Sequence, residues 1–195
     1  MGQKHKSPKK YGEDFDINLF DCEFLGEGNN GVVYLMPDGR VIKICKEQKS
    51  CDKEYFILKA VNGNRYFPKV YECNGNYMIR EYVGGECLKD YIKSHGLSRN
   101  LVVKLVHLVE EFRKLKFTKL DIRCRDIFIQ ANGSLLVIDP KSSYTRNVSF
   151  PRHMMKGLRN LGVLNEFLQV VKEHRPNLYT QWMEKLMLQQ WYEPE

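Results

Sequence analysis

The chain has 195 residues, of which 43% are hydrophobic and 28% charged, a composition typical of a folded globular protein. Its net charge of +7 favours acidic partners such as nucleotides, nucleic acid or an acidic protein, without choosing among them. No apolar run approaches the roughly 18 residues that span a membrane, and no signal peptide is present, so we expect a cytoplasmic protein without a membrane partner. Six scattered cysteines without zinc-type spacing favour reduced thiols over disulfides.

The N-terminal third of the chain has mainly β-type patterns. Residues 1–15 are polar and rich in lysine, and we expect a flexible basic tail there. The apolar-rich segment 17–25 predicts the first strand. Segments 67–72 and 77–82 predict two further strands around an Asn-Gly-Asn turn.

A glycine-rich stretch follows the first predicted strand. Residues 26–34 read GEGNNGVVY, a G-x-G-x-x-G-x-V pattern. In a dinucleotide-binding turn such glycines open a helix, but here the turn Pro-Asp-Gly and the apolar segment 41–44 follow. The pattern therefore predicts a β-hairpin whose bare backbone N–H groups can fold over phosphates.

Lys43 interrupts the apolar strand after this hairpin. It is either an edge-strand lysine that points to solvent or a cation that reaches the phosphates, and its V-I-K context favours the second. Residues 50–61 predict a helix, with Ser50 as its cap. Glu54 on that helix is a candidate partner for Lys43, and Glu47 is a weaker alternative.

The pattern becomes helical after the break at Gly84-Gly85. Residues 98–117 repeat apolar side chains at helical spacing. Three more helices are predicted, at 151–161, 164–172 and 176–191. We therefore expect an α+β fold with a flexible tail (1–15), a β-rich N-lobe with one helix (16–83) and a short, mainly helical C-lobe (84–195).

Three carboxylates flank a second hairpin. Asp126 precedes the apolar segment 127–129, an Asn-Gly turn follows, and the apolar segment 135–138 leads to Asp139. Closing the hairpin brings Asp126 and Asp139 together, with Asp121 just upstream. Oxygen ligands of this kind suit Mg²⁺, although three solvated loop acids would give the same pattern.

Over about residues 20–145, the order and spacing of these motifs resemble the protein kinase-like superfamily. The segment 77–83 (YMIREYV) resembles the last N-lobe strand and hinge. LDIRCRD resembles the catalytic loop, and Asp139 stands at the offset of the metal-binding aspartate. The closest likeness is to small, minimal kinases of the bacterial and RIO-like kind, because a short segment follows Asp139 and no A-P-E motif is present.

The resemblance implies an ATP- and Mg²⁺-dependent serine/threonine protein kinase with a bilobal fold. Asp121 would be the catalytic base, Lys43 and Arg123 would neutralise phosphates, and Asp126 and Asp139 would hold Mg²⁺. The implied nucleotide-binding residues are Gly26, Glu27, Gly28, Asn29, Asn30, Gly31, Val33, Val41, Lys43, Glu54, Glu81 and Val83. The acceptor would be a protein, including the chain itself at Ser142, Ser143, Tyr144 or Thr145.

Departures from the kinase pattern support an alternative, an inactive pseudokinase that binds ATP or acts as a scaffold. Lys119 and Leu120 replace the family's histidine and arginine, and Asp126 replaces its asparagine. Pro140 replaces the phenylalanine of D-F-G, and Arg80 occupies the gatekeeper position. A small-molecule kinase fits less well, because it would carry a larger, acidic C-lobe. No recognition motif supports nucleic-acid binding.

Overall fold

A computed structural model of the chain describes residues 17–140 and 143–188. The chain divides into two compact units. The first contains residues up to Lys59 together with Lys69–Tyr82, and the second contains Ala60–Pro68 together with the chain from Val83 onward. The predicted basic tail, residues 1–15, lies outside the described residues.

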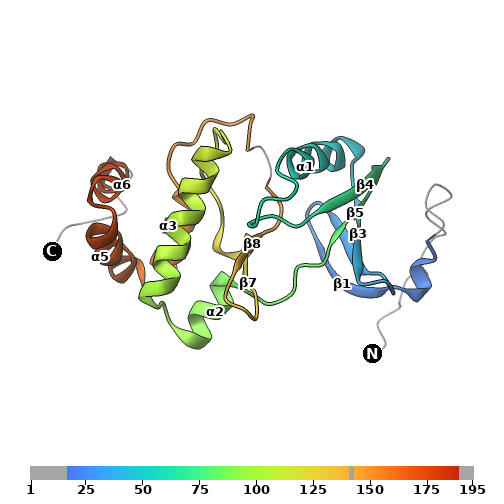
Figure 1. The fold of residues 1–195 in the computed structure, drawn as a ribbon, viewed down its shortest axis with the longest axis horizontal. Helices are drawn as coiled ribbons and strands as arrows, with labels where there is room; N and C mark the ends of the chain where they lie inside the picture. The colour runs from blue at the N-terminus through green and yellow to red at the C-terminus, as the bar shows by residue number, and fades with distance from the viewer. Residues whose placement is uncertain (1–16, 141–142, 189–195) are drawn as a thin grey trace, which may run out of the picture. The chain divides into compact units, whose positions relative to one another are not determined.

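The first unit is built on one antiparallel sheet with the strand order β1-β2-β3-β5-β4 (Figure 1). Its strands are β1 (Glu23–Gly28), β2 (Gly31–Leu35), β3 (Arg40–Cys45), β4 (Val70–Asn74) and β5 (Tyr77–Glu81). The α-helix α1 (Gln48–Ala60) follows β3. Strand β4 begins after Pro68, later than predicted, because proline has no N–H to donate to a strand neighbour.

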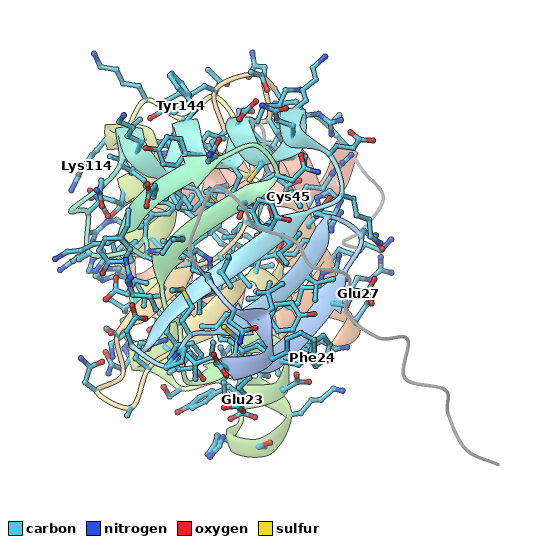
Figure 2. The ribbon with its side chains drawn as sticks, turned by 90° about the vertical axis from the view of Figure 1, so that its right-hand side faces the viewer. Glu23, Phe24, Glu27, Cys45, Lys114 and Tyr144 are labelled. Carbon is cyan, nitrogen blue, oxygen red and sulfur yellow. The ribbon has the colours of Figure 1, made fainter. Side chains whose placement is uncertain are left out.

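The glycine-rich stretch forms the predicted hairpin between β1 and β2. Gly28 pairs with Gly31, so that Asn29 and Asn30 make a two-residue turn. β1 is the edge strand of the sheet, and Figure 2 labels Glu23, Phe24 and Glu27 on it. The predicted strand start at residue 17 was wrong: Asn18 caps a short 3-10 helix, Leu19–Asp21, by accepting from the Phe20 N–H, and β1 begins only after it.

The two faces of the sheet carry different side chains. On one face, Met36, Ile42 and Ile79 form an apolar cluster. On the other face lie Val33 and Lys43, which pair across β2 and β3, together with Val41, two residues before Lys43. Helix α1 covers this second face, because Glu54 of α1 contacts Lys43. The helix begins at Gln48, so the prediction that Ser50 caps it was wrong.

In its described residues, the second unit combines five α-helices with a three-stranded sheet. The sheet has the order β6-β7-β8, with β6 (Glu86–Cys87), β7 (Ile127–Ile129) and β8 (Leu135–Val137). The helices are α2 (Leu88–His95), α3 (Arg99–Lys114), α4 (Arg152–Asn160), α5 (Leu164–His174) and α6 (Pro176–Leu188). The prediction that the last helix continues to residue 191 lies outside the described residues.

Helix α3 is the centre of this unit and packs on α5, which packs on α6 (Figure 1). Ser98 caps α3 by accepting from the Leu101 N–H at 3.2 Å. Aromatic stacking of Phe167 on Trp182, with centroids 6.0 Å apart, joins α5 to α6. Residues 60–68 belong to this unit because Phe67 stacks on Phe112 of α3.

The predicted α+β class is confirmed by the five-stranded sheet and the helices of the second unit. Within the described ranges, no helix combines the length and the apolar character that crossing a bilayer requires. The bilobal kinase arrangement and the cytoplasmic location stay predictions.

Gly31 should be far less tolerant of substitution than Gly28. A Cβ at Gly31, where φ is +153°, would lie 2.0 Å from the Ile44 carbonyl oxygen, whereas nothing lies within 4 Å of a Cβ at Gly28. We expect Gly31→Ala to lower the free energy of unfolding by more than about 2 kcal/mol and Gly28→Ala to change it by about 0.5 kcal/mol or less. Urea denaturation followed by circular dichroism measures both, and equal losses would contradict the assigned pairing of β2 with β3.

Candidate active site

Lys43 and Glu54 form a buried ion pair in the first unit. The Lys43 ammonium donates to both carboxylate oxygens of Glu54, at 2.7 Å and 2.5 Å. The two residues are only 7% and 2% exposed. Glu54 is therefore the partner of Lys43, as its place on the predicted helix indicated, and the edge-strand alternative for Lys43 is excluded. The part that this pair plays in nucleotide binding stays a prediction.

The other predicted nucleotide-binding residues of this unit surround the pair on the same sheet. Val33, Val41 and Lys43 share one face, as the register of β2 and β3 requires. Glu27 and Asn29 at the hairpin tip are exposed, and Lys46 lies 3.7 Å from the Glu27 carboxylate. The tip of the hairpin is therefore exposed, whereas Gly31 on β2 is buried.

The predicted hinge residues have partners of their own. Glu81 donates its backbone N–H to the Lys69 carbonyl at 2.8 Å, and its carbonyl accepts from the buried Arg80 guanidinium at 2.9 Å. Arg80 thus occupies one acceptor site of the Glu81 carbonyl, which is predicted to bond the edge of adenine. The gatekeeper position of Arg80 in the sequence did not reveal this hydrogen bond. Val83 is buried and belongs to the second unit.

Asp126 and Asp139 lie together at the open end of the hairpin β7–β8. The Ile138 N–H donates to the Asp126 carbonyl at 2.9 Å, which closes the hairpin at this end. Burial raises the pKa of Asp126, and the negative charge of Asp139 raises it further. Arg125, 3.7 Å from the Asp126 carboxylate, offsets part of this effect. The predicted proximity of the two carboxylates is therefore present.

This pair of carboxylates suits Mg²⁺ better than zinc. Among the described residues, no group of three or more histidine, cysteine or acidic side chains has the geometry of a metal cage. Mg²⁺ normally binds through one or two carboxylates and completes its shell with water and phosphate oxygens. Two neighbouring carboxylates, of which Asp126 has a raised pKa, are compatible with a site of this kind, and the metal itself stays a prediction.

The backbone at Asp139 is unusual. Its φ is +59°, in the left-handed region, although it is not glycine and Pro140 follows it. Such a conformation costs on the order of 1–3 kcal/mol and persists only where surrounding contacts impose it. The carboxylate predicted to bind metal thus stands on a locally strained backbone.

Asp121 contacts a residue that the sequence analysis missed, His153. The His153 N–H donates to Asp121 Oδ1 at 2.6 Å, and the ring Nδ1 is in hydrogen-bond contact with Asp121 Oδ2. His153 lies in the first turn of α4, where backbone N–H groups lack partners within the helix, so Asp121 acts there as a capping carboxylate. Asp121 itself is only 5% exposed.

Lys119, two positions before Asp121, was predicted only as a departure from the kinase pattern and not as a site residue. Burial lowers the pKa of Lys119, and the charges of Asp121 and Asp139 act in the opposite direction, so both carboxylates lie within its electrostatic range. Its position directly before the motif LDIRCRD was the sequence signal that could have identified it as a site residue. The sequence offered no such signal for His153, which is 32 residues from Asp121. Arg123 is exposed beside them.

The structure separates the candidate phosphorylation sites. Ser142 lies outside the described residues. Ser143 is buried and donates its hydroxyl to the Pro140 carbonyl at 2.8 Å, so it is a poor acceptor in this conformation. Tyr144 packs on Phe117, with ring centroids 5.0 Å apart. Thr145 is exposed.

Comparison with known proteins gives one relative to report and no matching family model. The chain is 24% identical over 128 residues to a Bacillus subtilis (strain 168) protein named "Putative serine/threonine-protein kinase YrzF". The match covers 61% of the chain and 58% of that protein, so the chain spans less than two thirds of its relative's length. This similarity suggests a kinase-like family.

Removing one partner of the Lys43–Glu54 pair should destabilise the protein strongly. We expect Glu54→Leu alone to lower the free energy of unfolding by about 3–5 kcal/mol, because it leaves a buried ammonium without a counter-charge. Combining it with Lys43→Met should restore most of that loss. Urea denaturation of the four proteins in this cycle measures the coupling, and additive losses would show that the two charges are not paired in solution.

Asp126→Asn should stabilise the metal-free protein at neutral pH. The pKa of Asp126 is raised above its ordinary value of 3.8, so the folded state resists its ionisation. Stability is then lost as the pH rises from about 3.8 through the raised pKa, and the variant avoids this loss. We expect the Tm of Asp126→Asn, measured in EDTA, to exceed that of the wild type at pH 7.

Two further measurements on the same variant, at lower pH and with added Mg²⁺, serve as controls. Its advantage in Tm should shrink as the pH falls toward 3.8, where the wild-type carboxyl is protonated in both states. Added Mg²⁺ should raise the Tm of the wild type more than that of the variant. A variant less stable than the wild type at pH 7 in EDTA would show that burial and the charge of Asp139 do not raise the pKa of Asp126 in the folded state.

Proposed function

We propose that the chain is an ATP- and Mg²⁺-dependent serine/threonine protein kinase of a minimal, atypical type. The observation that carries the proposal is the buried Lys43–Glu54 pair, on the sheet that bears the glycine hairpin. A buried ion pair contributes little to stability compared with apolar residues of the same volume, so its presence favours a functional role. The kinase-named relative and the carboxylates Asp126 and Asp139 support the same conclusion.

In this proposal the sheet of the first unit binds the phosphates and the adenine of ATP. The hairpin 26–31 covers the phosphates with backbone N–H groups, and Lys43, oriented by Glu54, neutralises their charge. Val33 and Val41 pack against the adenine. Its polar edge bonds to the backbone of Val83 and to the remaining acceptor site of the Glu81 carbonyl.

The carboxylates of the second unit supply the rest of the chemistry. Asp126 and Asp139 hold Mg²⁺, which when bound neutralises charge on the phosphate oxygens. Asp121 orients the acceptor hydroxyl and accepts its proton, and His153 holds the Asp121 carboxylate in place. Arg123 and Lys119 offset the negative charge of the transferred phosphoryl group.

One observation favours a second function, an ATP-binding module that transfers no phosphate. Both oxygens of Asp121 are already engaged by His153, so Asp121 has a structural role at the start of α4 that needs no catalysis. In that case Lys43, Asp126 and Asp139 still bind Mg-ATP. The two functions differ only in whether phosphate reaches an acceptor.

Phosphate transfer and nucleotide binding can be measured on the same variants. The full chain is incubated with γ-labelled ATP and Mg²⁺, alone and with a generic protein acceptor, beside Lys43→Met, Asp121→Asn and Asp139→Asn. We expect each variant to lose at least about 100-fold of the transfer rate. Asp52→Asn, an exposed acid on α1, is the matched control and should keep wild-type activity.

Thermal shifts with Mg-ATP separate the possible outcomes. Binding without transfer above the Asp121→Asn level would support the non-catalytic module. A wild-type protein whose Tm does not respond to Mg-ATP would overturn both functions.

A further inference from the structure

A cavity of the second unit lies at the turn of the hairpin β7–β8, at the end opposite Asp126 and Asp139. Its volume is about 360 Å³, at the lower end of the range of small-molecule sites. It is formed where the hairpin turn, helix α3 and the segment before β4 come together. The lining residues are Arg65, Tyr66, Lys104, His107, Asn132, Gly133, Ser134 and Leu135.

Three basic side chains line this cavity and no acid does. Arg65 donates to the Tyr66 hydroxyl at 2.9 Å, and Lys104 donates to the Gly133 carbonyl at 2.6 Å. The ring of His107 packs against the ring of His174. These contacts are with neutral groups, and within the described part of the chain no carboxylate pairs with any of the three. Their positive field is therefore available to an anion.

Neutral hydrogen-bond donors complete the lining. The Asn132 side chain accepts from the Ser134 N–H at 2.9 Å, which leaves its amide N–H₂ as a donor. The Ser134 hydroxyl makes no hydrogen bond to any described residue. The turn holding both is fixed by a Gly133 N–H to Gln130 carbonyl bond of 2.8 Å. The site thus offers guanidinium, ammonium, imidazole, amide and hydroxyl donors around one hairpin turn.

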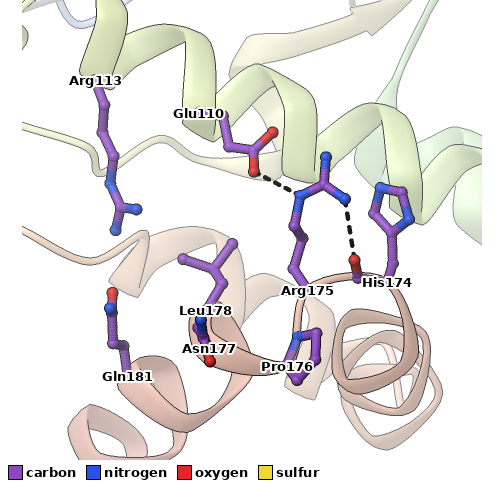
Figure 3. Close-up of a pocket in the computed structure, with 8 residues that line it drawn as sticks. All are labelled: Glu110, Arg113, His174, Arg175, Pro176, Asn177, Leu178 and Gln181. Atoms are coloured by element: carbon purple, nitrogen blue, oxygen red, sulfur yellow. Dashed lines mark hydrogen bonds and ion pairs between the residues drawn. The ribbon is translucent and has the colours of Figure 1, made fainter.

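A neighbouring cavity is also lined by basic residues, but it contains a carboxylate that pairs with one of them. It has a volume of about 260 Å³ and lies between α3 and the start of α6, where it is lined by Arg113, His174, Arg175 and others (Figure 3). There the Glu110 carboxylate accepts from the Arg175 guanidinium at 2.9 Å, so that charge is already balanced. The cavity at the hairpin turn contains no such carboxylate.

We propose that the cavity around Arg65, Lys104 and His107 binds a phosphate monoester. A phosphate monoester carries nearly two negative charges at neutral pH and three acceptor oxygens, whereas a carboxylate has one charge and two oxygens. The three basic groups and two neutral donors match the phosphate better. The proposal uses none of the residues assigned to ATP or Mg²⁺ and stands apart from the proposed function.

Nuclear magnetic resonance on the ¹⁵N-labelled full chain tests this site. Inorganic phosphate, O-phosphoserine, a phosphoserine peptide and its unphosphorylated form are titrated in turn at constant ionic strength, with chloride as the reference anion. We expect saturable shifts at the Gly133 and Ser134 amides with the three phosphate-bearing probes. Arg65→Ala and Lys104→Met should each weaken binding at least about tenfold. Arg113→Ala, from the neighbouring cavity, should leave the affinity unchanged.

The probes also distinguish the source of the phosphate. Equal affinity for O-phosphoserine and the phosphopeptide would assign the site to small phosphorylated molecules. Affinity at least about tenfold higher for the phosphopeptide would assign it to a phosphorylated polypeptide. The proposal is overturned by shifts that do not saturate, by equal binding of the unphosphorylated peptide, or by Arg65→Ala and Lys104→Met proteins that fold and bind as the wild type does. Arg65 is exposed, so its truncation tests binding without threatening the core.

Discussion

The first unit depends on the burial of two opposite charges at one point. Removing Lys43 and Glu54 from water costs several kcal/mol for each ion, and only direct hydrogen bonds between them offset this. The pair therefore requires α1 to lie over one face of the sheet with Glu54 directed at β3. The opposite face needs no such precision, because Met36, Ile42 and Ile79 bury apolar surface that tolerates small displacements.

The second unit is held together by several separate hydrogen bonds. The hairpin β7–β8 is closed at one end by the bond from Ile138 to Asp126 and tied to α3 at the other by Lys104. Asp121 fixes the start of α4 through His153. The backbone carbonyl of Asp126 and the carboxylate of Asp121 thus hold the fold at the same positions where chemistry is proposed, so that folding and function constrain the same residues.

The sequence predicted those features of the fold that depend on residues close together in the chain. The glycine hairpin followed from the strands around the Pro-Asp-Gly turn, the second hairpin from an Asn-Gly turn, and Glu54 from its place on a helix after Lys43. Contacts between distant segments escaped prediction. Nothing near Asp121 indicates His153, nothing near Arg80 shows that it bonds the Glu81 carbonyl, and Phe67 joins residues 60–68 to the second unit through an aromatic ring on α3. These partners depend on tertiary packing, which a single sequence does not encode in its periodicity.

The left-handed backbone at Asp139 limits which residues evolution or engineering can place there. Glycine adopts positive φ without strain, and aspartate and asparagine adopt it at a lower cost than alanine or β-branched residues do. An alanine at this position would therefore change the backbone energy and the carboxylate together, and its effect could not be assigned to either. Asparagine removes the charge and keeps the conformation. In a library of substitutions, we expect few residue types at position 139 to allow folding and fewer still to allow metal binding. The residue types that allow folding without metal binding then identify what the carboxylate contributes.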